Sequence, residues 1–131
     1  RLLKLLQELK KLILLLLFIP LVSFGQLTYE EKNTLAAEIF ETFSEDYIKK
    51  SFFIIVKLDD KAIAAATKKY PNPNDWEAQI DYQREIESAD RLAWYKKQKW
   101  WEKIKKNEDV AYNVRAKIIA YSYDKGWFDN I

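Results

Sequence analysis

The scarcity of glycine and proline constrains this chain more than any other feature of its sequence. Its 131 residues include two glycines and three prolines. Tight β-turns and short hairpins draw mainly on these residues, so a sheet built from hairpins would have few places to turn. We therefore expect an all-α fold, a small bundle of four or five helices.

The composition is that of one folded domain. Hydrophobic residues make up 49% of the chain and aromatic residues 15%. This is ample material for a packed core in a chain of this length. We assign residues 26–131 to a single α-helical domain and interpret the residues before it separately.

The N-terminal segment has the organisation of a secretory signal. Two lysines precede an apolar run over residues 12–22, and Ser23 and Gly25 supply small residues at the −3 and −1 positions of a cut before Gln26. The apolar run covers about 11 residues, fewer than the roughly 20 that a membrane-spanning helix needs. We predict a signal helix within residues 1–25, cleaved between Gly25 and Gln26.

Residues 9–26 resemble the signals of bacterial exported precursors in which Gln is the first mature residue. The resemblance concerns targeting and implies a periplasmic or extracellular protein. Residues 1–8 are interpreted as a spurious upstream extension, because Leu9 and two lysines stand where Met-Lys-Lys opens such signals. The chain has no cysteine, so we do not expect a lipoprotein. The alternative is an N-terminal amphipathic helix that is retained as a membrane anchor.

Helix start and stop signals divide the domain. Thr28 followed by Glu31 is a capping box, and Ser44 followed by two acidic residues favours a second helix start. Asn107 can cap the last helix, and Gly126 suits the left-handed position after its end.

The segment between these signals is ambiguous. Residues 52–56 are aromatic and β-branched and could form a strand, but residues 118–123 would be its only partner, and two strands make a marginal sheet. We therefore prefer a helix. Asp59 or Asp60 could then cap a short separate helix.

One long helix is predicted near residues 75–106, starting at Asn74 with Glu77 and free of glycine and proline. Uninterrupted, it would be about 48 Å long, so it must either extend past its neighbours or break. Its expected buried side comprises Tyr82, Ile86, Ala89, Ala93, Trp100 and Ile104.

Catalytic chemistry has little support in the sequence. Histidine and cysteine are absent, which removes the commonest general base and the thiolate nucleophile. The Ser-x-x-Lys spacing at Ser122 and Lys125 lacks the other elements of that motif and is expected by chance. We expect a protein that is not an enzyme and has no catalytic, cofactor-binding or metal-binding residues.

The segment of residues 94–103 suggests an interaction face, because aromatic rings and lysines occur close together within a few helical turns. Exposed rings could stack on a partner while the ammonium groups contact acidic groups. The alternative is that the rings belong to the core and the lysines are solvated near a helix C-terminus. The candidate residues are Trp94, Tyr95, Lys96, Lys97, Lys99, Trp100, Trp101 and Lys103.

The charge balance bears on the class of partner. The chain has 22 basic and 20 acidic side chains, and the predicted signal removes four basic residues and one acidic residue, which leaves 18 and 19. A nearly neutral exported domain does not point to nucleic acid. We expect an envelope protein, a glycan or a membrane surface as the partner. The competing functions are an envelope hydrolase that uses carboxylates or lysine, and the anchored protein named above.

Overall fold

The computed structural model describes residues 1–10 and 26–131, and all regular structure in these ranges is helical, with no strand. The predicted all-α class is therefore confirmed for this part of the chain. The α-helices that follow Gln26 are α2 (Tyr29–Glu41), α3 (Glu45–Lys69), α4 (Trp76–Lys97), α5 (Trp100–Lys103) and α6 (Glu108–Asp124). Two 3-10 turns accompany them, η1 (Pro73–Asp75) and η2 (Trp127–Asn130).

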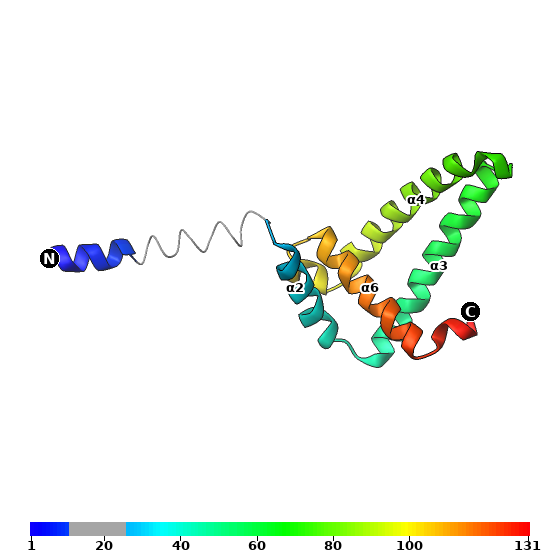
Figure 1. Cartoon of the computed structure of the whole chain (residues 1–131). Coiled ribbons are helices and arrows are strands. Elements are labelled where there is room, and N and C mark those ends of the chain that lie inside the picture. Colours follow the sequence, from blue (N-terminus) through cyan, green and yellow to red (C-terminus); the bar gives the residue numbers. More distant parts are fainter. Residues whose placement is uncertain (11–25) are drawn as a thin grey trace.

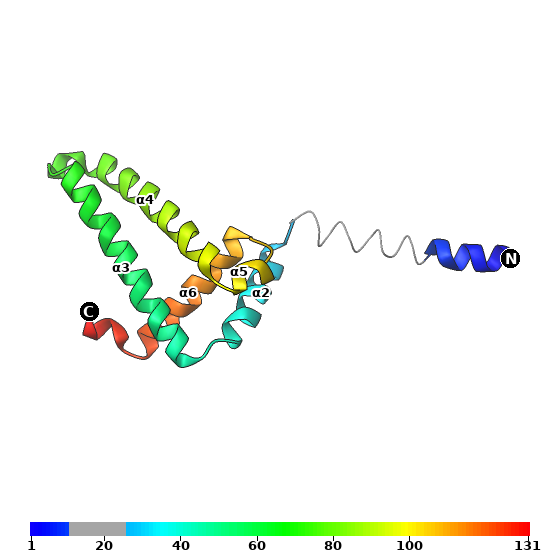
Figure 2. The same ribbon diagram turned by 180° about the vertical axis from the view of Figure 1, so that it is seen from behind.

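The three longest helices outline a triangle. Helices α3 and α4 form an antiparallel hairpin that is closed at η1 and widens toward its base, where α6 lies across the opening (Figure 1). The reverse view shows α5 at the end of α4, close to the start of α6 (Figure 2). Helix α2 packs along α6 in parallel, because Lys32 pairs with Asp109 at 2.6 Å and the rings of Phe40 and Tyr121 lie 6.0 Å apart.

Local capping signals are confirmed at four helix ends. The side chains of Thr28, Ser44 and Asn107 each accept a hydrogen bond from the backbone N–H three residues later, at 3.1–3.2 Å. Gly126, two residues after the end of α6 at Asp124, has a φ of +74°. A residue with a Cβ would be strained in that left-handed conformation, so glycine is suited to the position.

The middle of the chain is more continuous than predicted. Residues 52–56 are helical, as preferred, but they belong to α3, which runs without a break to Lys69. The prediction that Asp59 or Asp60 caps a separate helix is therefore wrong. No glycine or proline interrupts α3, and the Asp59 carboxylate bonds to a side chain of α6 instead of to a backbone N–H.

The long helix predicted over residues 75–106 breaks after Lys97. Gln98 has extended backbone angles, and its N–H donates to the carbonyl of Tyr95. The break brings the Trp101 ring back onto Tyr95, stacked at a centroid distance of 6.2 Å. A straight helix would carry Trp101 away from the rings that bury it, so the aromatic core ends α4 at this point.

Two finer expectations for this helix are corrected. Asn74 does not cap it, because Asn72 caps η1 by accepting the N–H of Asn74 at 3.0 Å, and α4 starts after that turn. Ala89 and Ala93 are exposed. Alanine has little apolar area to bury. The larger side chain of Leu92, next to Ala93 in sequence, packs against the core instead.

The core lies where α2, α3, α5 and α6 meet the end of α4. Its polar centre is the Tyr47 hydroxyl, which accepts the indole N–H of Trp100 at 2.9 Å and donates to the Oε1 of Gln98 at 2.6 Å. The side-chain amide of Gln98 donates in turn to the carbonyl of Trp94 at 3.0 Å. This chain of hydrogen bonds holds the α4–α5 turn against α3.

The N-terminal residues lie outside this core. Residues 2–10 are helical, and their five leucines are 53–76% exposed. None of the helices in residues 1–10 and 26–131 combines the length and hydrophobicity needed to span a bilayer. The apolar run over residues 12–22 and the predicted cleavage residue Gly25 fall outside the described residues.

Two tyrosine substitutions should have opposite effects on stability. Tyr47→Phe leaves the Trp100 N–H without its acceptor, so we expect the free energy of unfolding to fall by about 1–2 kcal/mol. Tyr95→Phe removes a hydroxyl that is buried without a hydrogen-bond partner in the protein, so we expect no loss and a gain of up to about 1 kcal/mol. Urea unfolding at neutral pH measures both changes. Equal losses in the two variants would contradict the assigned hydrogen bonds.

Candidate functional site

The structure separates the rings of the predicted interaction face from its lysines. Trp94, Tyr95, Trp100 and Trp101 are only 4–7% exposed and belong to the core. A partner that reaches this segment of the folded chain therefore meets lysine side chains and no rings. This arrangement matches the alternative interpretation, in which the rings belong to the core and the lysines are solvated. The exposed lysines are Lys96, Lys97, Lys99 and Lys103.

An ion cluster that the sequence analysis missed joins the three sides of the triangle. Arg115 of α6, nearly buried, donates to the Oδ2 of Asp59 on α3 at 2.9 Å. Arg91 of α4 lies 3.9 Å from the other oxygen of Asp59 and 3.2 Å from Glu87. Tyr112 covers the cluster, with its ring centroid 5.8 and 5.9 Å from the two guanidinium carbons. We call Asp59, Glu87, Arg91 and Arg115 the ion cluster.

Burial shifts two acidic groups in this region. It raises the pKa of the Asp59 carboxyl above its usual value, although the guanidinium groups of Arg115 and Arg91 oppose the rise. It also raises the pKa of Tyr95 to about 12, because the phenolate would be poorly solvated. The Tyr95 phenol therefore stays protonated at neutral pH and is not poised as a base.

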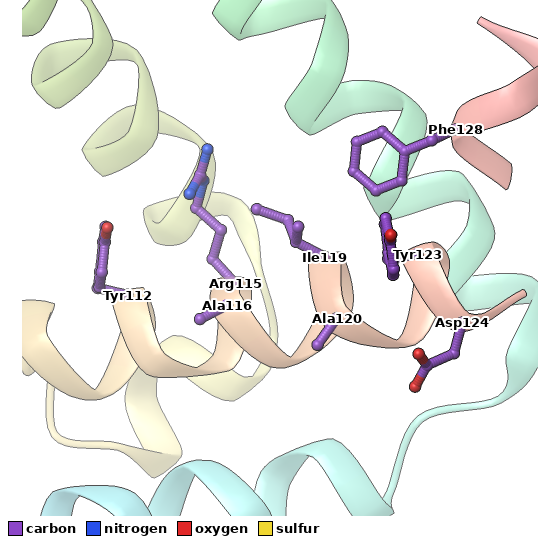
Figure 3. Close-up of a pocket in the computed structure, with 8 residues that line it drawn as sticks. All are labelled: Tyr112, Arg115, Ala116, Ile119, Ala120, Tyr123, Asp124 and Phe128. Atoms are coloured by element: carbon purple, nitrogen blue, oxygen red, sulfur yellow. The ribbon is translucent and has the colours of Figure 1, made fainter. Parts of the chain in front are cut away.

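A groove of about 440 Å³ runs along α6 beside the ion cluster. Figure 3 shows Tyr112, Arg115, Ile119 and Tyr123 on one side of α6, with Phe128 reaching in from η2. Ala116 and Ala120 also line the groove with short side chains. We define the α6 groove by its lining residues, Tyr112, Arg115, Ala116, Ile119, Ala120, Tyr123, Asp124 and Phe128.

The rings at the C-terminal end of the α6 groove are held in place by the core. Phe128 makes an edge-on contact with Phe52, which is fully buried, at a centroid distance of 4.8 Å. It makes a second such contact with Tyr123 at 6.1 Å. The left-handed turn at Gly126 redirects the chain after α6 and so places Phe128 beside Tyr123.

A smaller hollow of about 170 Å³ lies on the other side of Tyr112. It is more polar, since Ser88, Glu108 and Asp109 line it together with Arg91. Next to it, the Tyr95 hydroxyl and the Nε of Arg91 are buried without a hydrogen-bond partner in the protein. Such groups destabilise a fold and are uncommon in tightly packed regions.

The arrangement is suited to holding a ligand. Arg115 is oriented by Asp59, and Tyr112 lies over the two guanidinium groups, so the surface is ordered before anything binds. No group of three or more acidic side chains in residues 1–10 and 26–131 is placed to hold a metal ion. The sequence carried one local signal of this site, the spacing of Glu87 and Arg91 by four residues.

Titration of Tyr95 gives a test of its burial. An unfolded tyrosine ionises near pH 10, whereas folded Tyr95 keeps its proton until about pH 12. Its contribution to stability is therefore complete below pH 10 and is lost as the pH rises from 10 to 12. We expect Tyr95→Phe to lose about 2 kcal/mol less stability than the parent chain across this range. Urea unfolding in alkaline buffers measures the difference, and parallel pH profiles would contradict a raised pKa.

The ion cluster should respond more strongly to the loss of one partner than to the loss of both. Asp59→Ala leaves the buried Arg115 without its closest counter-charge, so we expect the free energy of unfolding to fall by about 2–3 kcal/mol. The double variant Asp59→Leu with Arg115→Met replaces the pair by apolar groups and should lose less. Denaturant unfolding of Asp59→Leu, of Arg115→Met and of the double variant gives the coupling energy. Additive losses would show that the pair is not coupled.

Comparison with known proteins gives no assignment. No family model matches the chain, and neither the curated proteins nor the solved structures provide a match. The α6 groove and the ion cluster are the features of the described chain that bear on its function.

Proposed function

We propose that the chain is an exported binding protein of the bacterial cell envelope, which loses residues 1–25 on export and holds a segment of a partner protein in the α6 groove. The observation that carries the proposal is the exposure of three rings around one hollow. Tyr112, Tyr123 and Phe128 are 51%, 73% and 39% exposed. Exposed apolar side chains that gather around one groove are typical of interaction sites.

Processing after Gly25 would remove none of the core residues that the structure describes in residues 1–10 and 26–131. Leu27 is the first residue along the described chain that packs against the core. Residues 1–10 are exposed throughout, as expected of a segment that the domain does not need for folding. These observations support the predicted signal peptide, because a cleavable segment must not contribute to the core.

A protein segment fits the α6 groove better than a polyanion does. Tyrosine and arginine are enriched where binding energy concentrates in protein interfaces, and here Tyr112 and Arg115 lie next to Ile119 on the groove surface. The Arg115 charge is already balanced by Asp59. The main attraction is therefore burial of apolar area, which suits apolar side chains of a partner.

The test compares two exposed tyrosines. Tyr123 lines the α6 groove, whereas Tyr29, which is 78% exposed at the start of α2, does not. We expect Tyr123→Ala to weaken retention of the mature protein on isolated envelopes by about tenfold or more, as for an interface residue worth at least 1.4 kcal/mol. Tyr29→Ala should bind like the parent chain. Circular dichroism checks that both variants remain folded.

Digestion of the envelopes identifies the class of partner. Retention that is lost after protease treatment supports a protein partner. Retention that survives protease but is lost after digestion of the glycan would contradict it in favour of a glycan, and retention on extracted lipid alone would favour the membrane surface. Equal retention of the two tyrosine variants would contradict the α6 groove as the site.

A further inference from the structure

The structure also points to a chemical modification at the start of the mature domain. We propose that Gln26, once it is freed by the cut after Gly25, cyclises to pyroglutamate and blocks the N-terminus. This inference rests on the proposed export. It goes beyond it by assigning a modification site and a product.

The geometry around Gln26 favours this reaction. Gln26 is exposed, whereas Leu27 packs against the core and Thr28 caps α2. The backbone is therefore anchored directly after Gln26, while its own side chain is in solvent. Neither its amide nor the new α-amino group needs to leave a packed site in order to react.

The reaction is an internal aminolysis. The deprotonated α-amino nitrogen of Gln26 attacks the side-chain amide carbon, and a new C–N bond closes a five-membered lactam. The bond from that carbon to the amide nitrogen breaks, and this nitrogen leaves as ammonia with the hydrogen that the amine gives up. No oxidant, metal or further reactant is consumed, although an enzyme could accelerate the step.

The product also suits the electrostatics of this helix end. The N-terminus of α2 is the positive end of its dipole, and a free α-ammonium group on Gln26 would add another positive charge nearby. Of the acidic residues in the first turn of α2, Glu31 already accepts a hydrogen bond from the Thr28 hydroxyl at 3.1 Å. The lactam carries no charge, so the cyclised terminus does not oppose the dipole.

The experiment measures the mass and the N-terminus of the mature protein. The full precursor is expressed in an exporting bacterial host, purified from the envelope or medium, and analysed by intact mass and tandem mass spectrometry. We expect a chain that begins at residue 26 and is lighter by one ammonia than the unmodified mature chain. It should resist stepwise N-terminal sequencing until pyroglutamyl peptidase removes the lactam.

Two controls exclude trivial causes. Gln26→Asn keeps the amide but would have to close a four-membered ring, so this variant should begin at residue 26 with its full mass. A synthetic peptide of residues 26–35 with free Gln, added at lysis, reports cyclisation during handling. The mature protein must contain a larger lactam fraction than this peptide, and equal fractions would overturn the proposal.

The outcomes separate this inference from the proposed function. A mature chain that begins with free Gln26 overturns cyclisation but supports export with the predicted cut. A chain that begins elsewhere or keeps residues 1–25 overturns both the cut and the modification. A lactam on Gln26 supports both.

Discussion

Burial of the aromatic rings near the end of α4 sets the geometry on which the rest of this structure depends. Four large rings occur within eight residues, between Trp94 and Trp101, and all of them are in the core. A continuous helix would distribute them around its axis and along about two turns, so some would face solvent. The break at Gln98 allows Tyr95 and Trp101 to stack. The loss of helical hydrogen bonds at the break is offset because the Tyr47 hydroxyl and the Gln98 amide form hydrogen bonds with polar groups in the turn.

The position of α6 follows from this turn. After α5 the chain passes Lys105 and Lys106, whose φ angles of +55° and +56° are unusual for residues with a side chain. The adjacent Ile104 is fully buried, so its packing can hold this tight connection in place. Helix α6 then starts at Glu108, with Asn107 as its cap, and crosses the open end of the hairpin. The crossing brings Arg115 to Asp59, a residue 56 positions away in sequence.

Local chemistry made much of the fold predictable. The caps at Thr28, Ser44 and Asn107 depend on side chains that reach their own helix a few residues later, so the sequence pattern contains all the required information. The end of α4 was not predictable in this way, because no glycine or proline marks Gln98. The partners that stabilise the turn, Tyr95 for Trp101 and Tyr47 for Gln98, come together only when the chain folds.

The candidate site was harder to foresee for the same reason. The sequence suggested Asp59 as a helix cap, because aspartate favours such positions. Its actual partner is Arg115, which the crossing of α3 and α6 brings next to it. Tyr123 and Phe128 become one surface only through the turn at Gly126. The glycine itself was recognised from the sequence. The groove that its turn helps to form requires knowledge of how α6 packs.

The lysine-rich segment and the α6 groove differ in how much ring area they leave exposed to a partner. A run of rings and lysines suggests contact with a partner, but a ring contributes to binding only if its area is exposed before the complex forms. The rings of Trp94 and Trp100 have already lost that area to the core. Tyr112 and Tyr123 retain theirs, and the ion pair at Arg115 and the contact of Phe128 with Phe52 order the surface around them. A surface that is ordered before binding pays a lower entropic cost when the complex forms. The α6 groove is therefore a better candidate for a partner site than the lysine-rich segment.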